Sequence, residues 1–236
     1  RRGQPVGGAS CERWRIMYND GMETLSLFPL NTVLFPGQLL PLQIFEPRYR
    51  QMIGECIQHG RAFGVVLIRS GEEVGDVAEP YEVGTTAHIV QVEGEADGRM
   101  NILCVGKSRF RIARLWQDKP YLHGQVELWP WEPYRAGRTA VERVRRRLDR
   151  YLQVLAETAD SKLELSLPEE PAALAHVAAS ILQIEVNEKQ RLLTTPSIGV
   201  LLNDIAELLQ RELRAWQIVQ ASRQLSPHET SSFSLN

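Results

Sequence analysis

The feature of this sequence that most limits its fold is a change in hydrophobic period near residue 132. Before that point apolar residues alternate with polar ones, as in "TLSLF" at 24–28, or form short apolar runs such as "AFGVVLI" at 62–68. After residue 135 they recur about every 3.6 residues, which places them on one face of a helix. The sequence therefore predicts an α+β fold, with a strand-rich part followed by a helical part.

The first part contains six or seven strand-like runs with one helix among them. This pattern is typical of a small closed or nearly closed β-structure, so we expect a β-barrel-like subdomain over residues 23–132. One apolar run includes Pro41, which cannot donate to a sheet ladder and therefore indicates an edge or bulged strand. The helix is expected to begin at Pro47, after an acidic cap at Glu46, and to end at Gly60.

The apolar stripes of the second part predict a bundle of three to five helices over residues 133–225. Asn187 is expected to cap one of these helices. Ser197 is expected to cap the last helix and not to act as a nucleophile, because no paired base lies nearby in the sequence. Residues 1–22 and 226–236 show no sustained period, and we expect flexible extensions there.

The composition is that of an ordinary soluble protein, with 43% apolar and 24% charged residues. Its three cysteines are far apart and suggest neither a disulfide framework nor a metal-binding pair, which favours a reducing compartment and hence the cytoplasm. No apolar run approaches the roughly 18 residues that a bilayer-spanning helix needs. A membrane partner is therefore not expected.

The search for catalytic chemistry finds no convincing site. "VGKS" at 105–108 lacks the glycine that a phosphate loop requires at position 101, and we interpret it as a hairpin end with a solvated Lys107. The five histidines show no metal-ligand spacing, and the acidic residues at 72–79 lack the fixed positions of a calcium loop. We predict no catalytic residue, no metal and no cofactor.

Four arginines, Arg143, Arg146, Arg147 and Arg150, lie opposite an apolar helical stripe. Such a face is most often solvated. The net charge of -2 gives no general attraction to nucleic acid. An RNA-binding patch at Arg146 and Arg147 nevertheless remains an alternative, and so does a homo-oligomer with the helical part as its contact arm.

The segment at 28–52, "FPLNTVLFPGQLLPLQIFEPRYRQM", is apolar and interrupted by four prolines. It has few groups able to move a proton, but its prolines pre-set the backbone of a fixed apolar surface. We predict a shallow cleft that receives hydrophobic, unfolded polypeptide by strand addition and side-chain pockets, lined by Leu34, Phe35, Pro36, Phe45, Tyr49 and Met52. The alternative is that these side chains form the core.

The same segment resembles the opening of the N-terminal substrate-binding domain of Lon-type ATP-dependent proteases. The resemblance continues through "FGVVLI", "VGTTAHIVQVE", "DGRMNILCVGKSRFRI" and "YLHGQVE", resumes at "NEKQRLL", and covers roughly residues 23–225. Within the matching segments we expect a structural role, and not ligand binding, for Gly37, Glu46, Pro47, Arg48, Arg109 and Phe110.

The resemblance implies a barrel similar to the PUA folds that bind RNA, a helical second half, and binding of proteins or peptides without catalysis. No complete phosphate loop, magnesium-binding acidic strand or Ser/Lys peptidase motif is present in the sequence. We therefore expect a stand-alone substrate-binding-domain protein, possessing neither ATPase nor peptidase, that acts as an adaptor in protein quality control. Its expected partners are unfolded clients and a protease or chaperone.

Overall fold

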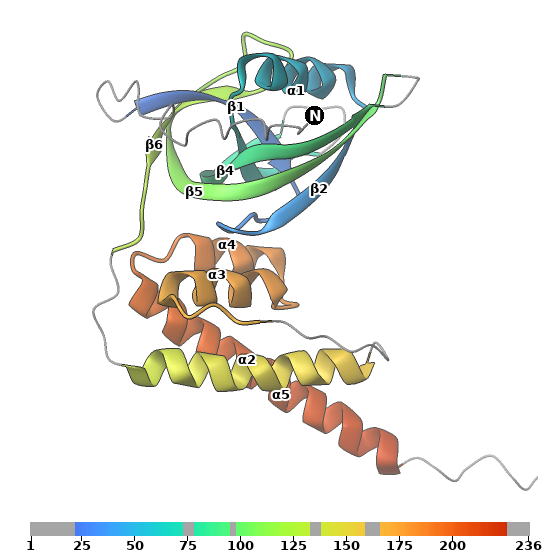
Figure 1. The fold of residues 1–236 in the computed structure, drawn as a ribbon, viewed down its shortest axis with the longest axis vertical. Helices are drawn as coiled ribbons and strands as arrows, with labels where there is room; N and C mark the ends of the chain where they lie inside the picture. The colour runs from blue at the N-terminus through green and yellow to red at the C-terminus, as the bar shows by residue number, and fades with distance from the viewer. Residues whose placement is uncertain (1–21, 73–77, 95–97, 133–137, 159–165, 226–236) are drawn as a thin grey trace, which may run out of the picture.

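A computed structural model describes residues 22–72, 78–94, 98–132, 138–158 and 166–225. Figure 1 shows the sheet with helix Pro47–His59 above it and the later helices of the chain stacked below it. The strands are β1 (Met22–Leu30), β2 (Leu39–Ile44), β3 (Phe63–Ser70), β4 (Glu79–Gly94), β5 (Met100–Trp116) and β6 (His123–Leu128). The helices are α1 (Pro47–His59), α2 (Arg138–Thr158), α3 (Pro171–Ile181), α4 (Val186–Leu193) and α5 (Ile198–Leu225).

The sheet closes on itself through its longest strand. The strand order is β2-β5-β4-β3-β1-β6, and β5 also pairs with β6, so five strands form a ring. Strands β1 and β3 run parallel, whereas the other pairs are antiparallel. The predicted α+β class, with a barrel-like first half and a helical second half, is confirmed.

Strand β2 lies outside the ring and pairs with β5. The Gly106 amide donates to the Gln38 carbonyl at 3.0 Å, so in this antiparallel register every second residue of β2 bonds to β5. Pro41, opposite Leu103, falls between these bonded pairs, and its nitrogen faces away from β5. The predicted edge strand is confirmed, because the missing N–H removes no ladder bond.

Strand β5 corrects one expectation from the sequence. Residues 100–116 form one continuous strand, so "VGKS" lies in the middle of a strand and not at a hairpin end. One register shift lies opposite this stretch, between Thr85 and Ala87 of β4, which pair with Arg109 and Gly106, and another follows between Ile112 and Arg114 of β5. The chain therefore bends through bulges, where the sequence had suggested a turn.

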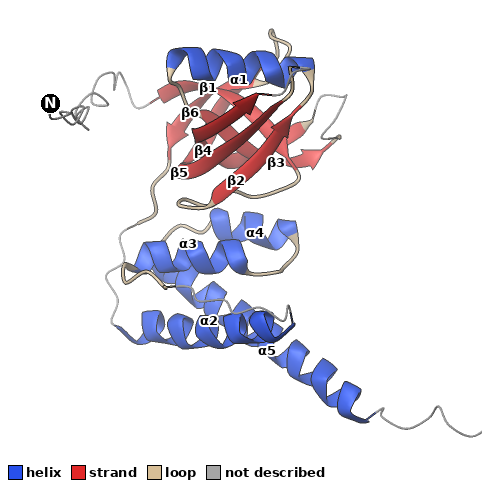
Figure 2. Cartoon of the chain, turned by 45° about the vertical axis from the view of Figure 1, so that its right-hand side comes forward, coloured by secondary structure: helices blue, strands red, loops and turns tan. Residues whose placement is uncertain are grey.

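Helix α1 covers one end of the barrel (Figure 2). It begins at Pro47, and Gly60 ends it in the left-handed conformation with φ 60°, as predicted. Glu46 occupies the cap position, but its carboxylate accepts a hydrogen bond from Arg48 Nε at 3.0 Å and none from the helix backbone. The expected acidic cap is thus an ion pair that fixes the helix start.

The helical half is held together by an apolar core that also reaches into the barrel. Helices α2 and α5 cross, and α3 packs against both. The buried cluster that joins them, which includes Leu148, Leu174 and Leu201, also contains Phe35 and Val83 from the barrel side. Within the described part of the chain, no helix has the length and hydropathy that a membrane crossing needs.

Two helix caps were predicted in this half, and one is wrong. The Val200 amide donates to Ser197 Oγ at 3.3 Å, so Ser197 caps α5 as expected. Asn187 lies inside α4, where its Oδ1 accepts a hydrogen bond from Tyr81, while Glu185 occupies the cap position. The sequence could not reveal this partner, because Tyr81 lies in the barrel.

The arginine-rich face of α2 is less solvated than expected. Arg147 donates to the Ala206 carbonyl at 2.6 Å and to Gln210 Oε1 at 2.5 Å, and it therefore joins α2 to α5. Arg146 remains exposed. One of the two arginines of the RNA-binding alternative is thus engaged within the protein, which weakens that alternative.

Candidate functional site

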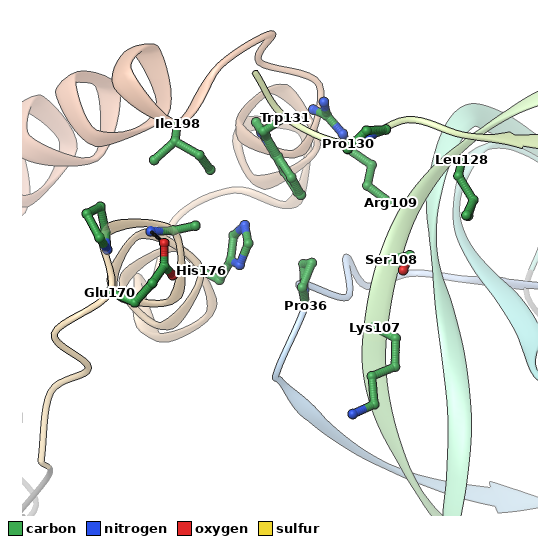
Figure 3. Close-up of a pocket in the computed structure, with 12 residues that line it drawn as sticks. Pro36, Lys107, Ser108, Arg109, Leu128, Pro130, Trp131, Glu170, His176 and Ile198 are labelled. Atoms are coloured by element: carbon green, nitrogen blue, oxygen red, sulfur yellow. Dashed lines mark hydrogen bonds between the residues drawn. The ribbon is translucent and has the colours of Figure 1, made fainter. Parts of the chain in front are cut away.

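A cavity of about 560 Å³ lies where the barrel meets the helices. We call it the junction cleft. Strand β5, the chain after β6, the turn before β2 and the starts of α3 and α5 all contribute to it (Figure 3). Its lining residues are Pro36, Lys107, Ser108, Arg109, Leu128, Pro130, Trp131, Glu170, Pro171, Ala172, His176 and Ile198. Most of these side chains are apolar, and three are prolines.

The turn at Phe35–Gly37 brings Pro36 to the cleft. Gly37 has φ 81°, a conformation that favours glycine, and its amide donates to the Gly106 carbonyl at 2.9 Å. The Phe35 amide donates to Gln38 Oε1 at 3.0 Å, which closes the turn. Phe35 itself is fully buried in the helical core. The turn therefore anchors the barrel to the helices and leaves Pro36 at the surface between them.

Arg109 of β5 forms the closest link between the two halves. Its Nε donates to the Trp129 carbonyl at 2.7 Å, and its Nη1 donates to the carbonyls of Leu193 and Thr195 at 2.8 and 2.6 Å. The guanidinium lies between the indole rings of Trp129 and Trp131, 3.9 and 3.8 Å from their centroids. This clamp fixes one wall of the junction cleft.

The charge of Arg109 is buried but retained. The residue is 2% exposed, and burial lowers its pKa to about 10, which leaves it protonated at neutral pH. Its Nη2 has no hydrogen-bond partner, and among the described residues no carboxylate pairs with it. Carbonyl oxygens and aromatic faces stabilise the cation where an acidic partner would otherwise be expected.

His176 of α3 faces the cleft beside Trp131. The two rings lie 4.7 Å apart with an interplanar angle of 47°. Burial lowers the pKa of His176 to about 4, and its Nε2 is buried without a hydrogen-bond partner. At neutral pH the imidazole is uncharged and adds an aromatic side chain to the wall of the cleft.

Glu170 and Lys107 are the remaining charged residues of the cleft. Both carboxylate oxygens of Glu170 accept hydrogen bonds from the start of α3, from the amides of Ala172 at 2.9 Å and Ala173 at 2.5 Å. Lys107 is exposed on β5. The cleft thus combines an apolar wall with one carboxylate engaged as a helix cap and two cations.

The predicted binding residues are divided between the core and two separate surfaces. Leu34, Phe35, Tyr49 and Met52 are each at most 5% exposed. The predicted cleft is wrong for these four side chains, because Phe35 belongs to the helical core and the other three belong to the core between α1 and the barrel. Pro36 lines the junction cleft, whereas Phe45 is 49% exposed and lies outside it.

The residues named as structural motif occupy structural positions. Glu46, Pro47 and Arg48 form the start of α1, as described above. Phe110 is fully buried and packs against Leu27 inside the barrel. Gly37 shapes the turn, and Arg109 clamps the two halves.

Sequence reasoning missed the far wall of the cleft. Pro130 and Trp131 follow β6, and Pro171 and His176 belong to α3, about 40 residues later in the chain. The available signal was the unusual "WPWEP" at 129–133, where tryptophan and proline occur at the change of period. The sequence did not indicate that this segment lies opposite the start of α3.

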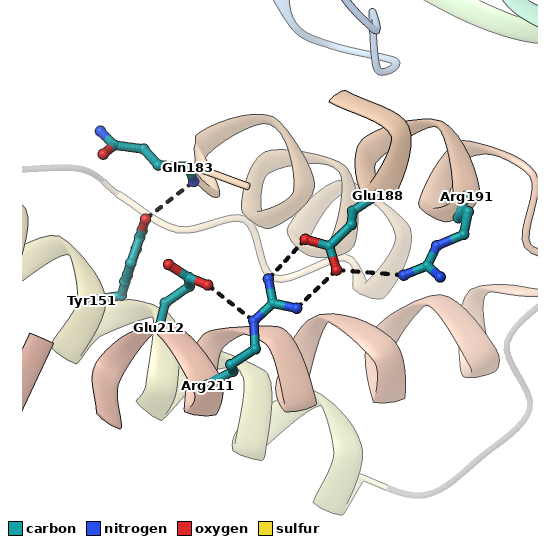
Figure 4. A network of polar contacts seen from close by, with 6 residues as sticks. All are labelled: Tyr151, Gln183, Glu188, Arg191, Arg211 and Glu212. Atoms are coloured by element: carbon teal, nitrogen blue, oxygen red, sulfur yellow. Dashed lines mark hydrogen bonds and ion pairs between the residues drawn. The ribbon is translucent and has the colours of Figure 1, made fainter. Parts of the chain in front are cut away.

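Other polar clusters are structural. Arg211 of α5 donates two hydrogen bonds of 2.8 Å to Glu188 of α4 and one to Glu212, and the pKa of Glu188 is lowered by Arg211 (Figure 4). Among the described residues, no group of histidines, cysteines and carboxylates is arranged to hold a metal ion. Burial raises the pKa of Cys56 to about 11 and of Cys104 to about 12, so neither is a reactive thiolate.

Comparison with known proteins identifies relatives along most of the chain. Lon protease 2 of Syntrophobacter fumaroxidans is 28% identical over 212 residues, covering 87% of this chain and 27% of the relative. The Lon protease of Parabacteroides distasonis is 30% identical over 229 residues, covering 90% and 27%. The chain spans about a quarter of the length of these relatives.

Solved structures agree with this relationship. A Lon N-terminal domain protein from Xanthomonas campestris has a TM-score of 0.62 and 25% identity, covering 78% of this chain and 96% of its own. The N-terminal domain of a Mycobacterium avium complex Lon protease, at 16% identity and a TM-score of 0.56, supports the fold. The family model of the ATP-dependent protease La (LON) substrate-binding domain matches residues 24–211. The chain therefore belongs to the Lon substrate-binding domain family.

Proposed function

We propose that this chain is a non-catalytic module that binds hydrophobic segments of unfolded polypeptides in the junction cleft. The observation that carries the proposal is the cleft itself. It is concave, has mostly apolar walls and a volume of about 560 Å³, and lies in a chain of the substrate-binding domain family. Binding sites are typically concave and apolar, with a few polar groups. The cleft replaces the predicted site at 34–52 and retains Pro36 from it.

The walls of the cleft favour binding because they are preorganised. Pro36, Pro130 and Pro171 restrict the backbone at three sides, and Trp131 is held by the Arg109 clamp. A ligand therefore orders few protein groups when it binds, and burial of its apolar side chains contributes about 25 cal/mol for each Å² removed from water. An unfolded segment offers such side chains, whereas a folded protein hides them.

The same residues are poorly suited to catalysis. Ser197 Oγ accepts a hydrogen bond from the Val200 amide, and within the described residues no histidine or lysine is hydrogen-bonded to the hydroxyl of Ser197 or Ser108. A serine without such a base is a weak nucleophile. We infer a role as an adaptor that holds clients for a protease or chaperone in the cytoplasm.

The proposal is tested with a fluorescently labelled protein kept unfolded by reduction and carbamidomethylation. Wild type should bind it, as measured by fluorescence anisotropy. Ala172→Phe places a large side chain in the cleft without removing a core contact, and should weaken binding about tenfold. Ala215→Phe, on an exposed position of α5, is the matched control and should bind like wild type.

Circular dichroism and thermal melting establish first that both variants fold. Absence of binding by folded wild type would refute the polypeptide-binding function. Equal binding by wild type and Ala172→Phe would place the binding surface elsewhere, with the exposed Phe45 as the next position to change.

A further inference from the structure

The charges around the junction cleft do not balance. Its lining contains two cations, Lys107 and Arg109, and one carboxylate, Glu170. His176 is neutral at physiological pH because burial disfavours its charged form. One carboxylate therefore faces two cations, and one positive charge is left over.

Glu170 offsets only part of this charge, because it is a single carboxylate and is directed at a helix start. Both of its oxygens accept amide hydrogen bonds from the first turn of α3. The positive end of the helix macrodipole lies at the same place and favours a negative charge there. The carboxylate is thus partly compensated by its own helix, and its field still reaches the His176 ring.

Arg109 contributes positive potential from within the wall. Its carbonyl and indole partners carry no formal negative charge, and its Nη2 is unpartnered. A charge 2% exposed is screened by solvent far less than one at the surface. The guanidinium is held by the clamp, so it acts on a ligand through its field and not by contact.

Lys107 supplies the group that a ligand can touch. It is exposed, it extends from β5 near Pro36 in Figure 3, and it has no ion pair with a carboxylate in the described parts of the chain. A flexible ammonium beside an apolar wall suits a ligand that presents a carboxylate next to an apolar side chain.

We propose that the junction cleft prefers hydrophobic segments in which a carboxylate lies next to the apolar side chain that enters the cleft, which we call the anchor. Lys107 is the residue that contacts the carboxylate. This inference rests on the proposed function and adds a charge preference to it. We take its source to be an acidic side chain within the segment, because an unfolded segment offers such side chains along its length, and the test separates it from the α-carboxylate at the end of a chain. Both present the same chemistry to Lys107.

The test uses labelled peptides with one apolar sequence and different flanks. One set places Asp, Asn or Lys beside the anchor, and a second set ends in a free carboxylate or an amide. Wild type should bind the Asp peptide about threefold more tightly than the Asn peptide, a difference expected of one exposed ion pair. The difference should shrink as the salt concentration rises.

Lys107→Glu should invert the preference, so that the Lys peptide binds more tightly than the Asp peptide. Arg114→Glu makes the same charge change on an exposed position of the same strand, outside the cleft, and should leave the preference as in wild type. A preference confined to the second set of peptides would identify the α-carboxylate as the source and overturn the acidic side chain. A preference confined to the first set would identify the side chain.

The outcomes separate this inference from the function on which it rests. Equal binding of the Asp, Asn and Lys peptides and of the acid and amide forms would overturn the charge preference and leave polypeptide binding intact. A preference that survives Lys107→Glu unchanged would also overturn it. Failure of folded wild type to bind any peptide or the unfolded protein would instead remove the proposed function.

Discussion

At the scale of single residues, His176 shows how the cleft couples to pH. The unfolded chain binds a proton at this imidazole near pH 6.5, whereas the folded chain binds it only near pH 4. The main cause is burial, and Arg109 acts in the same direction while Glu170 opposes it. Because the folded pKa is depressed, the unfolded state binds more protons between these values, and stability falls as the pH falls from 6.5 to 4.

Between pH 7 and pH 4.5, the free energy of unfolding should therefore fall by about 2 to 3 kcal/mol more in wild type than in His176→Phe. Phenylalanine has a similar shape and keeps the aromatic contact with Trp131. Urea unfolding at both pH values measures the difference. Carboxylates also titrate in this range, but they are common to both proteins. Equal losses would show that His176 is accessible to solvent and protonates normally.

Single residues also mark the limit of prediction from sequence. The sequence left Leu34, Phe35 and Tyr49 open between the lining of a cleft and the core, and in the structure all three are buried. It could not tell which neighbours cover them. Phe35 is buried by helices that begin about 100 residues later, so only tertiary packing decides between core and surface.

At the scale of elements, strand β5 organises both the barrel and the cleft. Its first half pairs with β2 and β4, its second half pairs with β6, and Lys107–Arg109 between them line the cleft. The change of period predicted which half has strands and which has helices. It did not predict that 100–116 is one strand, because Gly106 and its polar neighbours interrupt the apolar alternation where the bulges occur.

Gly106 gives a prediction at this scale. A Cβ added there would lie 2.4 Å from the Phe35 carbonyl oxygen and 3.0 Å from Leu34 Cγ, closer than packed atoms allow. Gly106→Ala should therefore destabilise the protein by about 1 to 3 kcal/mol, since the obstacle is backbone and the turn must move. Chemical denaturation measures the change.

Gly54→Ala is the matched control and should have the opposite sign. A Cβ at Gly54 of α1 meets nothing within 4 Å, so alanine should raise stability by about 0.5 to 1 kcal/mol through its better helix propensity. If Gly106→Ala were as stable as wild type, β5 would not approach the Phe35 turn as closely as the structure shows.

At the scale of the whole molecule, the barrel and the helices share one core. Val33, Phe35, Leu67 and Val83 from the barrel side belong to the cluster that joins the four C-terminal helices. Polar contacts cross the same boundary, as in the bond of 2.9 Å from Gln190 Nε2 to the Val83 carbonyl. The two-part organisation was readable from the hydrophobic period, but this shared boundary was not, because its residues are dispersed over the entire chain.

A shared core predicts that the protein unfolds in one cooperative transition. Tryptophan fluorescence, to which Trp129 and Trp131 at the junction contribute two of the five tryptophans, and far-ultraviolet circular dichroism should give coincident urea curves. Arg109→Met should shift both curves together by about 3 kcal/mol, because three carbonyls lose a charged donor and two indole rings lose their cation. Arg114→Met, on the exposed part of the same strand, should change stability by less than about 0.5 kcal/mol. Two separate transitions in wild type, or an unchanged midpoint in Arg109→Met, would mean that the halves fold independently and that the clamp does not join them.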